Sequence, residues 1–222
     1  MISTASQVSQ HTSVLLQEML ELIGPEGPNE GSIYVDGTFG AGGYSKAILE
    51  SANCQVIGID RDPYALEIGK KMAKSYQGRL HIIRGCFGDM IGLLAQIGIK
   101  RIDGVALDIG LSSMQIDNPE RGFSFLTNGP LDMRMDFQSS VNAAHMVNTL
   151  NEEDLANIIY TFGEERASRR IAAAIVETRA QKPFSTTDEL AKLIRGIVKR
   201  SKNGIDPATR TFQALRIHVN DE

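Results

Sequence analysis

The chain has 222 residues, of which 42% are hydrophobic, and its formal net charge is −4 at pH 7. This length suits one large domain or one domain with an insertion, and the negative charge argues against a generic nucleic-acid coat. There is no apolar run of the roughly 20 residues that a membrane span needs, no signal peptide, and no metal-ligand spacing around Cys54 and Cys86, so we expect a reduced cytoplasmic protein without a metal site.

The first predicted element is a helix over residues 11–23, which has a polar start and then apolar residues on one face. A Gly-Pro pair follows it directly and is expected to end it.

Residues 33–60 have the pattern of a nucleotide-binding strand–turn–helix–strand unit. An apolar run ends at Asp36, a glycine-rich turn leads into a helix over residues 44–51, and a second apolar run ends at Asp60. Glycines let the backbone approach a ligand without a Cβ in the way, and the following helix directs its free N–H groups at the same point. Asp60 is placed to accept hydrogen bonds from ribose hydroxyls. The unit therefore predicts a bound adenosine.

The sequence of the turn favours S-adenosylmethionine over a dinucleotide. The turn reads G-x-x-G-x-G-G from Gly37 to Gly43, not G-x-G-x-x-G, and Asp36 immediately precedes it. A carboxylate there would repel a pyrophosphate, but it suits the ammonium and sulfonium groups of S-adenosylmethionine. NAD and a purely structural turn are the alternatives.

Further strands are expected over residues 80–83 and 104–107, with helices starting at Asp62-Pro63 and spanning residues 90–96. Strands that alternate with helices predict a parallel sheet with right-handed crossovers, so the fold class is α/β.

Ligands of such sheets bind outside the carboxyl ends of the strands. Asp36, Asp60, Phe87 and Asp108 each lie at or just after such an end, so we expect them to converge on one site. Phe87 could stack on adenine or simply fill the core, and Asp108 could belong to the site or cap a loop.

Beyond Asp108 the pattern changes to a long turn-rich stretch and then to helices. Residues 110–136 show little periodicity, which is typical of a functional loop, and an internally paired structural loop is the alternative. Helices are expected over 141–147, after an Asn151 N-cap, over 164–179, from a Thr186/Glu189 capping box to 199, and from Asp206 onward. We interpret residues 1–136 as an α/β cofactor-binding domain, 137–205 as an all-helical insertion, and 206–222 as a helix that returns to the first domain.

Charge is distributed unevenly along the chain. Up to Tyr160 there are 11 basic and 19 acidic residues, and from Thr161 onward there are 12 basic and 8 acidic residues. A basic second half is compatible with a surface that faces RNA and equally with ordinary solvated helices. The candidate RNA contacts are Arg166, Arg169, Arg170, Arg195, Lys199 and Arg200.

Several stretches closely resemble one family, among them HTSVLL, VDGTFGAGGYS, LDIGLSSMQID, GPLDMRMD and TRTFQALRI. The resemblance runs from His11 to the last residue and is to bacterial 16S ribosomal RNA cytosine-N4 methyltransferases, the MraW or RsmH family. It implies a class I, Rossmann-like S-adenosylmethionine-dependent methyltransferase with a helical insertion. The implied substrate is the N4 amine of a cytidine in the decoding region of 16S rRNA, free or in the small ribosomal subunit, with no DNA or membrane partner.

The resemblance also implies roles for single residues. Gly42, Gly43 and Tyr44 would line the methionine part of the cofactor, Asp60 would hold the ribose, Phe87 would lie at the adenine, and Asp108 and Gln115 would complete the pocket near the methyl group. Many family members have histidine in place of Tyr44, so a backbone contact is the firmer expectation there. The proline pair and aromatic residue that follow the acid of many amino-methyltransferases are absent after Asp108. We therefore hypothesise that Asp108 orients the amine or the cofactor, mainly by positioning.

Family members continue beyond the C-terminal RIHVN stretch with further strands, so we expect an incomplete sheet, a truncated chain and an exposed apolar fourth strand. Two alternatives stay open, and the oligomeric state is left open with them. One is an S-adenosylmethionine enzyme that acts on another nucleic-acid amine, and the other is an inactive fragment.

Overall fold

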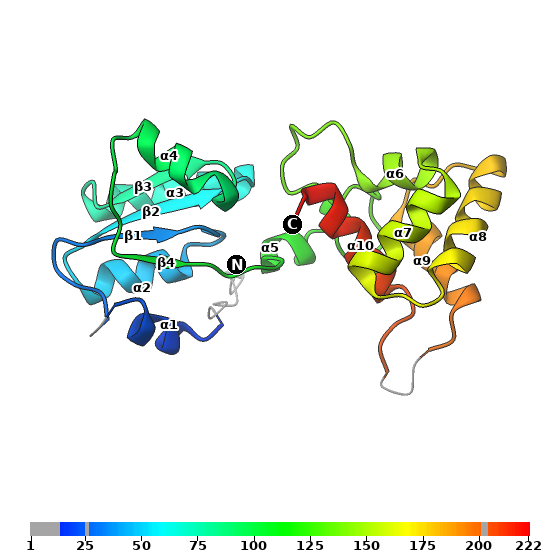
Figure 1. The fold of residues 1–222 in the computed structure, drawn as a ribbon, viewed down its shortest axis with the longest axis horizontal. Coiled ribbons are helices and arrows are strands. Elements are labelled where there is room, and N and C mark those ends of the chain that lie inside the picture. The colour runs from blue at the N-terminus through cyan, green and yellow to red at the C-terminus, as the bar shows by residue number, and fades with distance from the viewer. Residues whose placement is uncertain (1–13, 25–26, 201–203) are drawn as a thin grey trace, which may run out of the picture. The chain divides into compact units, whose positions relative to one another are not determined.

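A computed structural model describes residues 14–24, 27–200 and 204–222 (Figure 1). His11 to Ser13 of the HTSVLL motif, Pro25 and part of the polar loop after residue 200 lie outside the described residues. The contacts divide the chain into two compact units, Met1–Ser112 and Ser113–Glu222, which we call the first and the second unit.

The first unit contains a parallel sheet of four strands in the order β3-β2-β1-β4. The strands are β1 (Ile33–Asp36), β2 (Gln55–Asp60), β3 (Leu80–Arg84) and β4 (Gly104–Ala106). The prediction of an α/β fold with four parallel strands is confirmed. β4 forms one edge of this sheet, and its Val105 side chain is 42% exposed, as expected for an apolar edge strand.

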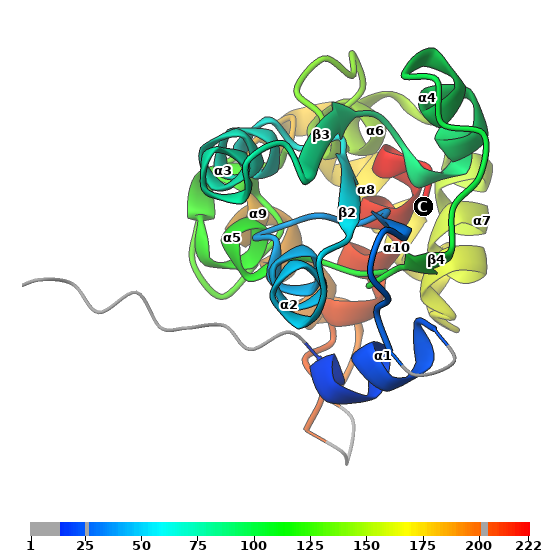
Figure 2. The same ribbon diagram turned by 90° about the vertical axis from the view of Figure 1, so that its left-hand side faces the viewer.

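Helices cover both faces of the sheet: α1 (Leu16–Leu22), α2 (Gly43–Ser51), α3 (Pro63–Ala73) and α4 (Met90–Gln96). Alternate strand residues point to opposite faces, so Tyr34 and Val56 pack with α1, α2 and α3, whereas Val35 and Ile57 pack with α4. Figure 2 shows α2 and α3 on one side of the sheet and α4 on the other. Both faces are buried, which explains why the strands read as continuous apolar runs.

The second unit is helical. Its helices are α5 (Ser113–Asp117), α6 (Ala143–Thr149), α7 (Glu152–Gly163), α8 (Ser168–Gln181), α9 (Thr187–Ile197) and α10 (Thr209–Asn220). Helix α7 packs against both α8 and α10, and α8 packs against α9. Gly163 permits the close approach of α7 to α10, because a Cβ added there would lie 2.4 Å from the carbonyl oxygen of Arg210.

Side-chain caps mark the starts of three of these six helices, α6, α7 and α9. Asn151 caps α7 by accepting from the Asp154 N–H, and Thr186 and Glu189 form the predicted capping box of α9. The expected start of a helix at residue 164 is wrong, since Glu164 adopts a positive φ of 50° and ends α7, so that α8 begins only at Ser168. Likewise α10 begins at Thr209 rather than at Asp206.

The stretch expected to be an irregular loop contains α5 and a 3-10 turn, Pro119–Arg121. Its later part is fixed to α10 by Asn220, whose Nδ2 donates to the Met133 carbonyl at 2.7 Å and whose Oδ1 accepts from the Met135 N–H at 2.6 Å. GPLDMRMD and the C-terminal RIHVN stretch therefore meet within the second unit. The expected domain boundaries at residues 136 and 205 stay a prediction.

Candidate functional site

The four predicted residues of the first unit lie at one edge of the sheet. Asp36 and Asp60 are the last residues of β1 and β2, Phe87 follows β3 and begins a 3-10 turn, and Asp108 follows β4. Because all four strands are parallel, their carboxyl ends share this edge. The glycine turn that starts at Gly37 lies at the same edge.

Asp36 is a buried carboxylate, and only one of its two oxygens accepts hydrogen bonds from the described residues. It is 1% exposed, and its Oδ2 accepts from the Ser45 N–H at 3.1 Å and from the Ser45 hydroxyl at 2.7 Å. Among the described residues, no group donates a hydrogen bond to Oδ1. Burial raises the pKa of Asp36 to about 6, against the lowering effect of the bonds from Ser45 and of the nearby Thr38 N–H. In its ionised form the group has a buried oxygen whose hydrogen bonding is incomplete, which is costly unless a cation or donor meets it.

Asp60 closes the glycine turn. Its Oδ2 accepts from the Gly40 N–H at 2.7 Å, and its Oδ1 accepts from the Asp62 N–H at 2.9 Å. Burial raises the pKa of Asp60, while these two amides lower it. Each carboxylate oxygen has a second lone pair, so a ribose contact is compatible with these bonds and stays a prediction.

The buried side chain of Phe39 packs under the glycine turn and limits its conformation. Phe39 was not among the residues predicted from the sequence to matter for this site. Gly42 has a φ of 79°, and a Cβ added there would lie 2.6 Å from the ring of Phe39 and 2.7 Å from the end of Met72. Phe39 is 2% exposed. Gly42 is therefore needed for the packing of a core side chain and not only for the approach of a ligand. The pattern in the sequence that could have predicted this packing is an aromatic residue in the middle of a glycine-rich turn.

Tyr44 lies in the first turn of α2, directly after Gly43, the first residue of that helix. Its hydroxyl donates to the carbonyl oxygen of Val14 at 2.6 Å, so the side chain is held by the segment that precedes α1. Burial raises the pKa of Tyr44, and the carboxylates of Asp108 and Asp36 raise it further, which places negative charge near this helix N-terminus. The predicted contacts of Gly42, Gly43 and Tyr44 with a cofactor stay predictions.

Asp108 is tied to the turn through its backbone. Its N–H donates to the Thr38 hydroxyl at 2.7 Å, and its side chain is exposed. Phe87 is half-buried, and its Cβ would lie 3.1 Å from a Cβ at Gly37, so the two segments touch. Gln115 is a buried residue of α5 in the second unit. Its role in a cofactor pocket stays a prediction.

Comparison with known proteins connects these features to one family. A family profile described as "MraW methylase family" matches residues 8–222. The chain belongs to the MraW methylase family. One relative, "Ribosomal RNA small subunit methyltransferase H" of Rhodospirillum rubrum, is 57% identical over 215 residues, which cover 97% of this chain and 65% of that protein.

Proteins with the same name from Paramagnetospirillum magneticum and from a Wolbachia of Drosophila simulans are 58% and 55% identical, over 65% and 71% of their lengths. The chain thus spans about 65% of the length of the first two relatives. Family membership confirms the resemblance drawn from the sequence motifs and agrees with the observed α/β sheet.

No helix in the described part of the chain is long and apolar enough to cross a membrane. The same residues contain no group of three or more His, Cys, Asp and Glu side chains arranged to hold a metal ion.

Proposed function

We propose that this chain is the greater part of an S-adenosylmethionine-dependent methyltransferase that modifies small-subunit ribosomal RNA in the cytoplasm. The observation that carries the proposal is the edge of the sheet in the first unit, where the glycine turn lies among Asp36, Asp60 and Asp108. It occurs in a chain of the MraW methylase family whose relatives are named ribosomal RNA small subunit methyltransferases.

The charge at this edge suits the proposed cofactor. S-adenosylmethionine carries an ammonium and a sulfonium group, and a buried anion with an unpaired oxygen favours a cationic partner. Asp36 Oδ1 supplies that acceptor next to the N-terminus of α2. Asp60 would hold the ribose and Phe87 would lie against the adenine, and the bound cofactor would supply an electrophilic methyl group.

The remaining task of the protein is to prepare the nucleophile. The exocyclic amine of cytosine is a poor nucleophile because its lone pair is delocalised into the ring, so positioning in line with the methyl group carries much of the rate. As the new bond forms, the amine becomes acidic and needs an acceptor. Asp108 has an exposed carboxylate fixed to the turn through Thr38, which suits it for orienting such an amine. The resemblance of the sequence motifs to cytosine-N4 methyltransferases then points to the N4 amine of a cytidine in the decoding region as the substrate group.

The test combines cofactor binding with methyl transfer. Calorimetric titration with S-adenosylmethionine should be done on this chain and on a longer form that covers the full length of its relatives. Transfer of a labelled methyl group into small-subunit rRNA, with total DNA and protein as competing acceptors, should then follow with the form that binds. An Asp108→Asn variant should bind cofactor and lose turnover. If the longer form bound no cofactor, or labelled another acceptor in preference to rRNA, the proposal would be wrong.

A further inference from the structure

The second unit contains a pocket of about 280 Å³ between α7 and the start of α8. It is lined by Ala156, Asn157, Tyr160, Arg166, Ser168, Arg169 and Arg170. The pocket is small beside the roughly 300–1,000 Å³ of sites for drug-sized molecules. It therefore suits one small charged group better than an entire cofactor.

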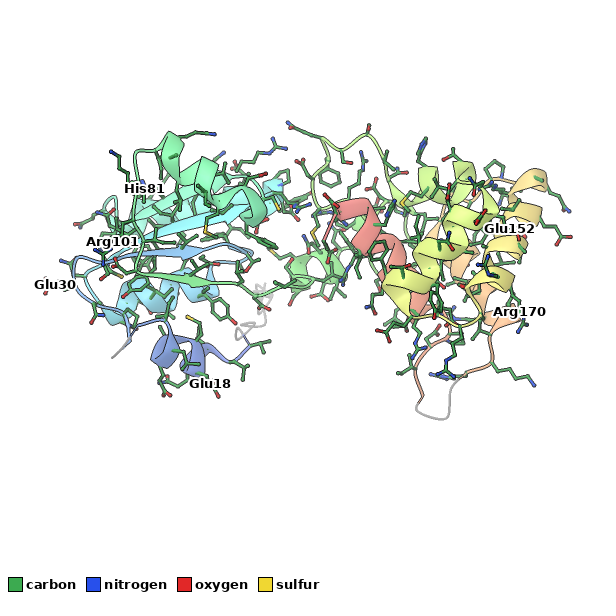
Figure 3. All side chains as sticks on the ribbon, in the orientation of Figure 1. Glu18, Glu30, His81, Arg101, Glu152 and Arg170 are labelled. Carbon is green, nitrogen blue, oxygen red and sulfur yellow. The ribbon has the colours of Figure 1, made fainter. Side chains whose placement is uncertain are left out.

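The lining is strongly basic. It includes three arginines and no carboxylate. In the part of the chain that the structure describes, Arg166 and Arg169 form neither a hydrogen bond nor an ion pair through their side chains, whereas Arg170 donates to the Ile197 carbonyl at 3.1 Å. Figure 3 shows Arg170 near the beginning of α8. Two carboxylates precede these arginines in the chain. Glu164 is exposed and does not line the pocket, and Glu165 is buried and accepts from the Ala167 N–H at 2.7 Å, so it belongs to the turn before the helix.

The pocket also offers an aromatic platform. Tyr160 of α7 is 61% exposed although it lines the pocket, and Asn157, one turn earlier, adds a side-chain donor and acceptor. Guanidinium groups next to an exposed aromatic ring are the combination that binds single-stranded nucleic acid, where arginines hold phosphates and the ring stacks on a base.

Most of the other basic side chains expected to contact RNA are already engaged. Arg195 forms an ion pair with Asp206 at 3.0 Å and lies over the ring of Phe125, and Arg200 donates to the Gly204 carbonyl. Among these candidates, the guanidinium groups of Arg166 and Arg169 are therefore free in the described part of the chain, whereas Arg170, Arg195 and Arg200 are each held by a contact within the fold.

We propose that this pocket binds the phosphodiester backbone of the single-stranded part of the rRNA substrate, with Arg166 and Arg169 on a phosphate and Tyr160 stacked on an adjacent base. The inference rests on the proposed function for the identity of the RNA. The existence of a site for a phosphate and a base on α7 and α8 is tested separately from cofactor binding.

The experiment measures the binding of a fluorescein-labelled RNA with the sequence of the decoding region to this chain, over a series of salt concentrations. The double variant Arg166→Gln/Arg169→Gln should bind about ten-fold more weakly, and its salt dependence should be shallower by about one phosphate contact. Tyr160→Ala should lower the affinity about five-fold or more at every salt concentration, whereas Tyr160→Phe should keep it, because stacking needs only the ring.

The matched control is Lys100→Gln/Arg101→Gln, which removes the same charge from an exposed segment of the first unit just before β4, whereas Asp108 follows β4. Arg101 is labelled in Figure 3. Thermal unfolding of each variant shows whether the fold is intact. The proposal is overturned if the pocket variant and the control bind alike, if the unaltered chain does not bind this RNA, or if a poly-glutamate peptide competes as well as the RNA. A chain that binds S-adenosylmethionine but fails these tests would leave the proposed function standing.

Discussion

The two units present opposite charges in two different ways. In the first, carboxylates stand at the ends of buried parallel strands and meet around a glycine turn, and Asp36 is almost completely buried. In the second, arginines project from a helix start into an open pocket. A small cation that must be held at one position favours a desolvated anion, whereas a polyanion that is bound along its length favours exposed cations. The net charge of −4 averages over these two regions of opposite charge and reveals neither.

The largest effect is expected from Asp36→Asn. The amide can keep the bonds from Ser45 but removes the charge that would meet the cofactor ammonium, so affinity for S-adenosylmethionine should fall about 100-fold, or about 3 kcal/mol. Calorimetric titration measures this in the form that binds. Because the site is buried, the affinity should depend little on salt, in contrast to RNA binding at the arginine pocket. An unchanged affinity would remove Asp36 from the cofactor site.

The second effect is on stability and has a defined pH window. The pKa of Asp36 is raised from 3.8 to about 6 in the folded chain. The folded state therefore binds more protons than the unfolded state between these values, and stability falls as pH rises through the window. The free energy of unfolding should drop by up to about 3 kcal/mol between pH 4 and pH 7 without cofactor.

Denaturant titrations at several pH values measure this dependence. Asp36→Asn should remove most of it and should be the more stable chain at pH 7. Identical pH profiles for the two chains would show that Asp36 ionises without cost.

A third, smaller effect tests the turn itself. Gly42→Ala forces a side chain into the left-handed region and into the ring of Phe39, which should cost about 2 kcal/mol. Gly78→Ala is a matched control, because Gly78 has a φ of 83° and nothing within 4 Å of an added Cβ. It should cost only about 1 kcal/mol. Denaturant unfolding measures both. Equal losses of stability in the two variants would mean that the Phe39 ring moves aside, and that its packing does not determine the conformation of the turn.

The smallest effect concerns the helical unit. Thr186→Ala removes the hydroxyl half of the capping box of α9 and should lower stability by about 1 kcal/mol. Thr149→Ala is the comparison, since that hydroxyl only donates to the His145 carbonyl on an exposed helix surface and should matter little. Thermal unfolding of the two variants measures the difference. A loss at Thr149 as large as that at Thr186 would show that the cap is not what starts α9.

Short-range chemistry made much of the fold predictable. The apolar runs and the acids at their ends identified the strands and their shared edge. Parallel strands that are buried on both faces consist of apolar residues, so the first acidic residue after such a run marks the end of the strand. Caps at Asn151 and Thr186 likewise depend on residues three positions away. The start of α8 could not be found this way, since Glu164 takes a left-handed conformation that its residue type does not indicate.

By itself, the sequence determined the parallel α/β unit, the shared sheet edge at which Asp36, Asp60, Phe87 and Asp108 lie, and membership of the MraW methylase family. Only the tertiary structure decided that Phe39 fills the space under the glycine turn, and that Asn220 binds Met133, 87 residues earlier. It also decided which arginines share a pocket with Tyr160 and which are bound to Asp206 or to carbonyl groups. The reason is physical: strand pattern and caps are set by neighbours along the chain, whereas the partners of a side chain are set by which distant segments the core brings together.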